Sequence, residues 1–296
     1  LLKKNPEKSK KPNFLIFITD QFNPNCLGYA GNNIINTPNI DKLAQNGVSF
    51  SRMYTSQPLC MPARASLFTG LTPRGHRVRM NGIPLDPSFP TFTEALRKAG
   101  YHTHSCGKIH LNVTNAPEGL FEENPEDYPE CRENWLSGRI KELPLPYYGL
   151  ESVDFIGGHG HGSYGDYSNW LQKEHPDKAH LFFDGVPLEE PSHAYELFNR
   201  NSYKWALPQK LHPMKWIADK TISFLEDKGE SRNQERPFCL ISSIQEPHPP
   251  FSPPAPYCYH HDPEDMPAPL KREGEYNEIK TGRNRWRYRF RENHLL

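Results

Sequence analysis

The stretch Asn13-Phe14-Leu15-Ile16-Phe17-Ile18-Thr19 (NFLIFIT) is an almost unbroken apolar run that stops at Asp20-Gln21. A run of this length without polar alternation is typical of a strand buried on both faces, and such strands form parallel sheets covered by helices. The stretch Phe238–Ile244 (FCLISSI) is a second run of this kind and ends before Gln245. The two runs therefore predict strands of an α/β sheet.

Helical segments separate these runs, as an α/β sheet requires. Thr37 is a candidate N-cap, Pro38 suits the first helical position and Gly47 supplies a stop, so a helix is expected between them. Further helices are expected at Pro62–Thr69, Phe92–Ala99 and His212–Lys228, and further strands at Val48–Tyr54 and Tyr101–Cys106. The predicted fold class is α/β, with a mostly parallel central sheet and helices on both faces.

The composition favours a compact core wrapped in long connections. The chain has 296 residues, 30 of them proline, and its 35 Lys and Arg balance its 35 Asp and Glu. No global field attracts nucleic acid or a membrane surface, and no apolar run has the length of a membrane span. We expect a basic N-terminal tail at residues 1–12, a catalytic α/β domain at 13–270 and a basic, aromatic tail at 271–296.

The last of these segments alternates arginine with Asn, Trp, Tyr and Phe between Arg283 and Arg291. Such interleaving can mark nucleic-acid binding, but no second basic patch supports that interpretation. An edge strand with one charged face, or a tail whose continuation is missing, is the favoured interpretation. The expected partners therefore include neither nucleic acid nor a membrane.

The cysteines show no disulfide framework, no CxxC and no spacing typical of a zinc site. Five of the six are interpreted as unpaired cysteines of mixed burial, and Cys60 is the exception. No signal peptide or transmembrane segment is visible in the chain as given, and a signal upstream of Leu1 is compatible with it. A cytoplasmic location and a periplasmic or secreted one both stay open.

Polar residues follow three of the predicted strands. Asp20-Gln21 follows the first run, Gly107–His110 follows Cys106, and Gln245–His248 follows Ile244. Reactive residues of open α/β sheets gather beyond the carboxyl ends of the strands. Oxygen ligands at such an edge suit a hard cation, and lysine or histidine there can hold an anion and move protons.

The segment Leu59–Gly70 (LCMPARASLFTG) adds a candidate nucleophile. Cys60 lies two residues before Pro62, at the start of a predicted helix, where the helix dipole favours an anionic sulfur. Arg64 follows four residues later and can lie close to the same side chain. The residues alone indicate a reactive cysteine beside an anion-binding arginine.

This segment resembles the sulfatase signature, Cys-x-Pro-(Ser/Ala)-Arg followed by Thr-Gly, in a family whose cysteine is oxidised after synthesis to Cα-formylglycine. The similarity continues through Asp20-Gln21, Thr37–Ala44, Gly107–His110 and Pro247–Phe251. The resemblance implies an alkaline-phosphatase-like fold and a sulfuric ester hydrolase. It also implies that the later strands and a smaller C-terminal domain are missing, which would leave apolar surface exposed.

The resemblance further implies a cofactor. Asp20, Gln21 and the modified Cys60 would be ligands of Ca²⁺, or of another divalent cation such as Mg²⁺ or Mn²⁺, that acts as a Lewis acid. The family pattern includes a later Asp-His or Asp-Asn pair before Gly, and a further Lys, and neither follows Pro267. We therefore expect this chain alone to bind metal poorly and to turn over little or nothing.

The remaining roles also follow from the resemblance. The hydrated formylglycine at Cys60 would attack sulfur, and Arg64 would orient its two hydroxyls. Lys108 and His248 would bind sulfate oxygens, and His110 would act on the second hydroxyl so that sulfate leaves and the aldehyde re-forms. The expected partners are a small sulfated substrate and a formylglycine-generating or sulfatase-maturating enzyme.

Two alternatives stay open. Asp20-Gln21 departs from the Asp-Asp of many arylsulfatases and is similar to choline-sulfatase-like and phosphonate-monoester-hydrolase-like members, so a phosphonate monoester or phosphodiester hydrolase is one alternative. A catalytically silent anion-binding homologue, in which Cys60 is never oxidised, is the other.

The segment Gly157–Gly162 (GGHGHG) has two histidines two residues apart. Because no third ligand has matching spacing, the favoured interpretation is a flexible glycine loop near the mouth of the cleft. If it is functional, we expect it to contact the organic part of the substrate.

Overall fold

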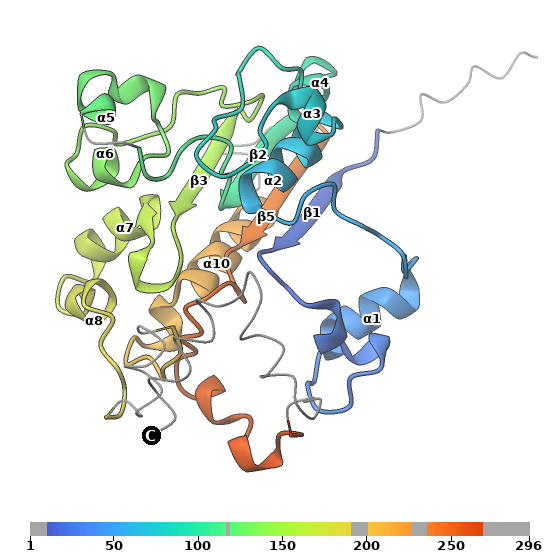
Figure 1. The fold of residues 1–296 in the computed structure, drawn as a ribbon, viewed down its shortest axis with the longest axis vertical. Helices are drawn as coiled ribbons and strands as arrows, with labels where there is room; N and C mark the ends of the chain where they lie inside the picture. The colour runs from blue at the N-terminus through green and yellow to red at the C-terminus, as the bar shows by residue number, and fades with distance from the viewer. Residues whose placement is uncertain (1–10, 117–118, 191–200, 227–235, 269–296) are drawn as a thin grey trace, which may run out of the picture.

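The computed structural model describes residues 11–116, 119–190, 201–226 and 236–268. Its centre is a sheet in the order β1-β5-β2-β3-β4, made of β1 (Phe14–Thr19), β2 (His102–Gly107), β3 (Ser152–Gly157), β4 (Tyr164–Gly165) and β5 (Phe238–Ile244). The first four strands in this order pair in parallel, and β4 pairs antiparallel with β3. The predicted mostly parallel α/β sheet is confirmed (Figure 1).

Helices cover both faces of the central strands. Helix α2 (Cys60–Thr69) packs on one face in a buried cluster that includes Met61, Ala65, Phe68, Phe155 and Ile241. Helix α10 (Pro213–Glu226) packs on the other face in a cluster that includes Cys106, Ile156, Trp216, Ile217 and Leu240. Neighbouring residues such as Leu240 and Ile241 enter opposite clusters, because successive side chains of a strand alternate between faces.

Several predicted elements are confirmed, with small shifts of their ends. The run at 238–244 is β5, the predicted helix at 212–228 is α10, and the helix expected at 62–69 begins two residues earlier, at Cys60. The other α-helices within the described ranges are α1 (Pro38–Asn46), α3 (Pro73–His76), α4 (Phe92–Lys98), α5 (Leu120–Glu123), α6 (Arg132–Leu136), α7 (Asp166–Glu174) and α8 (Ala179–Phe183).

The prediction that the first run is buried on both faces is wrong. β1 is an edge strand paired with β5, and Phe14, Leu15 and Phe17 are 39%, 44% and 60% exposed. Ile16 and Ile18 of β1 pack against the cluster that contains the buried residues of α2, whereas Leu15 and Phe17, on the other face of the strand, remain exposed. The expectation of exposed apolar surface is confirmed for this strand.

The segment between β1 and α2 also differs from its prediction. The strand expected at Val48–Tyr54 does not form, and both of its end residues are more than three-quarters exposed. Without a neighbouring strand, the backbone groups of this segment have no ladder to join. The helix at Pro38 does form, but the Thr37 hydroxyl accepts from the Gly28 N–H and donates to Asp41 instead of capping α1.

Some predictions concern residues outside the described ranges. The arginine-rich segment from Arg283 to Arg291 lies there, as do most of the two expected tails at residues 1–12 and 271–296. Within the described ranges, no helix combines the length and the apolar character that a membrane crossing requires.

Candidate active site

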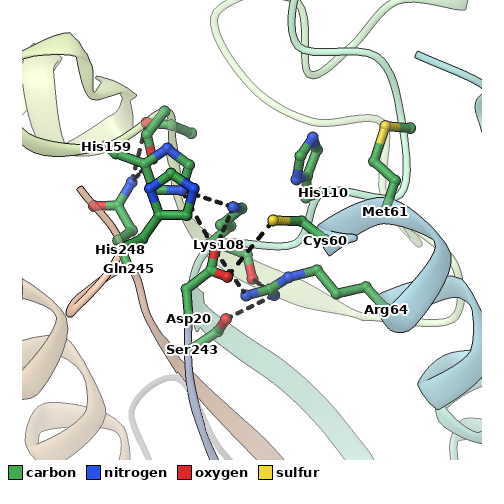
Figure 2. Close-up of polar contacts among 12 residues, drawn as sticks. Asp20, Cys60, Met61, Arg64, Lys108, His110, His159, Ser243, Gln245 and His248 are labelled. Carbon is green, nitrogen blue, oxygen red and sulfur yellow. Dashed lines mark hydrogen bonds and ion pairs between the residues drawn. The ribbon is translucent and has the colours of Figure 1, made fainter. Parts of the chain in front are cut away.

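Four strands bring their carboxyl ends to one edge of the sheet. β1 ends before Asp20, β2 before Lys108, β5 before Gln245 and β3 before Gly158-His159. These strands are parallel neighbours, so the residues that follow them lie side by side. Helix α2 begins at Cys60 over the same edge, and Figure 2 shows its sulfur facing Asp20.

Asp20 is the centre of this polar cluster. Its Oδ2 accepts a hydrogen bond from Lys108 Nζ and lies 3.8 Å from Arg64 Nη2, and its Oδ1 lies 3.6 Å from Cys60 Sγ. Burial opposes ionisation of Asp20, but the contact with His159 and the charges of Lys108 and Arg64 outweigh it, so its pKa lies well below the usual range. Asp20 is therefore an anion between two cations.

Arg64 supports the cluster from α2. Its Nη1 donates to the Lys108 carbonyl at 2.8 Å and to Ser243 Oγ at 2.9 Å, so one guanidinium joins the ends of β2 and β5. Burial lowers the pKa of Arg64, and the negative charge of Asp20 opposes that change. With Lys108 as a second buried cation, the cluster has a positive excess suited to an anionic group.

Two histidines stack beside Lys108. The rings of His159 and His248 lie 3.6 Å apart at an angle of 6°, and His248 Nδ1 lies 2.7 Å from the Pro249 carbonyl, to which it donates. His159 Nε2 lies 2.8 Å from Lys108 Nζ and 3.3 Å from Asp20 Oδ2. One ring nitrogen cannot accept from Lys108 and donate to Asp20 at once.

Burial lowers the pKa of His159 to about 4, so the ring is neutral at pH 7 and carries one N–H. With this proton on Nδ1, Nε2 accepts from the Lys108 ammonium at 2.8 Å; with the proton on Nε2, the ring donates to Asp20 at 3.3 Å. In either case the Lys108 ammonium lies next to both the Asp20 carboxylate and the His159 ring.

His110 lies across the opening from His159. It has a left-handed backbone conformation (φ 57°), and its N–H donates to the buried Glu130 carboxylate at 2.7 Å. Glu130 also accepts from the N–H groups of Leu111 and Asn112 and from the hydroxyl of Tyr147. Burial and the nearby Lys108 and Arg64 charges depress the pKa of His110, so its ring is neutral. Its buried Nδ1 has no hydrogen-bond partner among the described residues.

The glycine segment that carries His159 is tied to the end of β5. Gln245 is buried and donates through Nε2 to the carbonyls of Gly157 and Gly158. The ring of His161, two residues further on, lies within hydrogen-bond distance of the Tyr203 hydroxyl. The loop is held at several points, and His159 lies inside the polar cluster rather than on a free surface.

These side chains line a cavity of about 550 Å³. Four of the predicted site residues, Cys60, Lys108, His110 and His248, contribute to its wall. His159 of the glycine segment also lines it, as do Asn81, Arg132 and Tyr164, which the sequence did not single out. Asn81 also accepts a hydrogen bond from the Met61 N–H at the start of α2, which helps to hold Cys60 at the wall. A cavity of this size with convergent polar groups suits a small anionic ligand.

The described residues do not make a complete site for a hard cation. Asp20 supplies one carboxylate, and its Oδ2 already faces Lys108, Arg64 and His159. Gln21 follows at an exposed position with φ 56°, and within the described residues its side chain makes no hydrogen bond to the cluster. Ca²⁺ takes six to eight oxygen ligands, so this donor set falls short.

The fold and the site together define an alkaline-phosphatase-like α/β protein with a pocket lined by Lys108 and histidines at the carboxyl edge of its sheet. The family model of sulfatases matches residues 12–268, and the chain belongs to the sulfatase family. Members of this family generally use a divalent metal and a formylglycine.

Relatives and solved structures agree with this assignment. The chain is 28% identical to an arylsulfatase of Clostridium perfringens over 88% of its length and 48% of the relative. It is 31% identical to an uncharacterised sulfatase of Escherichia coli K12 over 84% of its length and 41% of the relative. It also resembles the phosphonate monoester hydrolase of Agrobacterium radiobacter, with a TM-score of 0.64 and 29% identity over 87% of this chain and 45% of that one. The chain thus spans about half the length of the curated relatives it matches.

Proposed function

We propose that the whole protein hydrolyses a sulfate ester, with a nucleophile made by oxidising Cys60. The observation that carries this proposal is the position of Cys60 Sγ. It lies 3.6 Å from Asp20 Oδ1, on the wall of a cavity that Lys108, His110 and His248 also line. The family membership of the chain supports the same reaction class.

The proposed nucleophile is the hydrated formylglycine at position 60. One of its hydroxyls attacks sulfur, the alcohol of the ester leaves, and the second hydroxyl then allows the sulfated hemiacetal to collapse to aldehyde and sulfate. Arg64 lies one helical turn after Cys60 and orients the diol. A plain serine or cysteine ester would instead need water to attack a second time.

The anion-binding role falls to Lys108 and His248 in this proposal. The Lys108 ammonium faces the cavity, and His248 presents Nε2 because its Nδ1–H is engaged by the Pro249 carbonyl. Both are fixed before substrate arrives, which lowers the cost of stabilising charge on the sulfate oxygens. Stacked on His248 and in contact with Lys108, His159 would position these two groups.

His110 is the proposed base for collapse of the hemiacetal. Its pKa is depressed by burial, so the ring is neutral and able to take a proton at pH 7. Its backbone is fixed by Glu130, which keeps the ring over the cavity next to Cys60.

A divalent cation, Ca²⁺ or an alternative such as Mg²⁺ or Mn²⁺, remains part of the proposal for the whole protein. Asp20, Gln21 and the modified Cys60 would contribute to its ligands, and the remaining oxygen ligands would come from outside the described residues. For the 296-residue chain alone we expect weak metal binding and little or no turnover.

Phosphonate monoester hydrolysis is the second candidate. Two observations favour it: the Asp20-Gln21 pair, and the structural likeness to the phosphonate monoester hydrolase of Agrobacterium radiobacter. Turnover of an aryl sulfate and an aryl phosphonate by the same preparation of the whole protein compares the two directly. A higher kcat/KM for the phosphonate would replace sulfate hydrolysis as the main activity.

Mass spectrometry of the Cys60 peptide, from protein made in its native host, tests the nucleophile. Formylglycine lowers the peptide mass because an aldehyde oxygen replaces the sulfur. We expect this change and at least roughly hundredfold loss of sulfate hydrolysis in Cys60→Ala, with Cys26→Ser as the matched control that keeps activity. An intact thiol in fully matured protein would support the catalytically silent alternative.

A further inference from the structure

A second cluster of ligand-type side chains lies on the sheet face that α10 covers. His104 and Cys106 come from β2, and Asp154 comes from β3, where it is the register partner of Cys106. Within the described ranges, these three form the one group of His, Cys, Asp or Glu side chains whose ligand atoms all lie within 4.8 Å of one another. Neither the fold nor the proposed reaction requires such a group.

The separations of the three ligand atoms are close to those around a tetrahedral zinc ion. His104 Nε2 lies 3.2 Å from Cys106 Sγ and 3.2 Å from Asp154 Oδ2, and Sγ lies 3.9 Å from Oδ2. Zinc bonds to nitrogen, sulfur and oxygen, combined with tetrahedral angles, place ligand atoms roughly 3.3–3.6 Å apart. Movements of a few tenths of an ångström would therefore bring all three atoms onto one ion.

The surroundings orient His104 for this role. Its Nδ1 lies 2.7 Å from Ser152 Oγ, and its ring stacks on Phe224 of α10 with centroids 4.6 Å apart and an angle of 7°. A donation from Nδ1–H to Ser152 leaves the Nε2 lone pair facing Cys106 and Asp154. A metal-bound histidine usually has its second nitrogen fixed by such a hydrogen bond.

One carboxylate oxygen of the cluster is left for a ligand, and the cluster reaches solvent. Lys220 Nζ binds the other carboxylate oxygen of Asp154 at 2.8 Å, which leaves Oδ2 facing His104. The Asp154 and Lys220 side chains are 23% and 40% exposed, so the cluster has a route to solvent.

We propose that His104, Cys106 and Asp154 bind a zinc ion, with one coordination position open to water. Imidazole, thiolate and carboxylate together favour zinc over calcium or magnesium. On binding, the Cys106 S–H bond breaks, a sulfur–zinc bond forms and one proton enters the solvent. The ion would join β2 to β3, the two strands whose ends carry Lys108 and His159.

Cobalt(II) substitution in the 296-residue chain tests the site. A Cys60→Ala background removes the thiol nearest Asp20, so that a cobalt–thiolate signal reports another cysteine. We expect a near-ultraviolet thiolate-to-cobalt charge-transfer band that saturates at one cobalt per chain and disappears when zinc is added. No such band, or a band that zinc leaves unchanged, would overturn the proposal.

Variants then assign the ligands. Cys106→Ser in the same background should abolish the band, whereas Cys239→Ser, which changes another fully buried cysteine one strand away, should retain it. A band that persists in Cys106→Ser would contradict the site. If Cys106→Ser does not give a native circular dichroism spectrum, zinc affinity is measured in Asp154→Asn instead. The Asp154 side chain is partly exposed, so this substitution should disturb the fold less. Its zinc affinity should fall roughly tenfold or more with unchanged folding, and unchanged affinity would contradict the site.

Discussion

The two strands β1 and β5 are alike in composition and opposite in burial. They pair in parallel along their whole length, and Leu15 of β1 is the register partner of Leu240 of β5. Leu240 is fully buried, whereas Leu15 is 44% exposed. β5 has a strand on each side and helices over both faces, while β1 is at the edge of the sheet. An apolar run thus predicts a strand, but neighbours decide how much of it is buried.

Beyond their carboxyl ends, the two strands no longer differ in burial. Asp20, which follows the exposed β1, is buried and ionised, and its pKa lies well below the usual range despite burial because His159, Lys108 and Arg64 stabilise the anion. Glu246, two residues beyond the buried β5, has its pKa raised to about 7 by burial. Its Oε2 is buried without a hydrogen-bond partner among the described residues. The carboxyl edge of the sheet is therefore well covered even where the body of a strand is not.

The largest effect is expected from the same substitution made in both strands. Leu240→Ala should lower the free energy of unfolding by about 2–5 kcal/mol, because it opens a cavity in a packed cluster. Leu15→Ala should lower it by less than about 1 kcal/mol, since much of that side chain already contacts solvent. Urea unfolding followed by circular dichroism measures both, and equal losses would show that the two strands are equally covered.

A pH-dependent difference of roughly 2–3 kcal/mol is expected for Glu246→Gln. The raised pKa means that the folded chain binds a proton that the unfolded chain has lost, so wild-type stability falls as pH rises from about 4.5 to 7. Glutamine carries no charge, so the variant should match the wild type near pH 4.5 and be more stable at pH 8. Urea unfolding at the two pH values tests this. If the variant loses as much stability between pH 4.5 and 8 as the wild type does, Glu246 is not the cause of the pH dependence.

A smaller effect is expected where the strands meet the site. Ser243→Ala removes an acceptor of the buried Arg64 guanidinium and should cost about 1–2 kcal/mol, because Arg64 keeps the Lys108 carbonyl. Thr19→Ala at the exposed end of β1 is the matched control and should change stability by less than about 0.5 kcal/mol. Chemical unfolding provides the comparison, and a neutral Ser243→Ala would show that Arg64 does not depend on this hydroxyl.

Phe17→Asn should change stability little but alter the exposed surface of β1. This side chain is 60% exposed, so its replacement should alter the free energy of unfolding by less than about 1 kcal/mol. The exposed apolar surface of β1 should nevertheless shrink, which lowers the fluorescence of a bound hydrophobic dye. Undiminished fluorescence would mean that dye binds elsewhere, for example over the exposed residues Val48 and Phe50.

Much of the fold and most of the proposed site could be predicted from the sequence, because the signals were local. The runs at 14–19 and 238–244 form strands, and the residues directly after them, Asp20 and Gln245, lie at the carboxyl edge. The same rule places Lys108 there, after β2. The solvent exposure of the β1 side chains could not be predicted in the same way. The apolar pattern of β1 predicts burial, but its environment depends on segments far away in the sequence.

His159 shows why the rest of the site could not be predicted. β3 (Ser152–Gly157) contains Ser152 and Asp154, so it lacks the continuous apolar pattern of β1 and β5. Because the sequence pattern does not indicate this strand, it favours a glycine loop near the mouth of the cleft for the residues that follow. Had β3 been identified, the strand-end rule would have placed His159 beside Lys108, where the structure has it.

Glu130 gives the long excursion between residues 115 and 149 an unexpected importance. Its carboxylate binds three consecutive N–H groups after β2, including that of His110, and accepts from Tyr147 at the far end of the same excursion. We expect that changes to the outer turns of this segment leave His110 in place as long as this carboxylate is kept. A graft that omits the interior carboxylate, however, would release the loop that holds this histidine, so redesign of specificity should keep Glu130 and Tyr147 together as one unit.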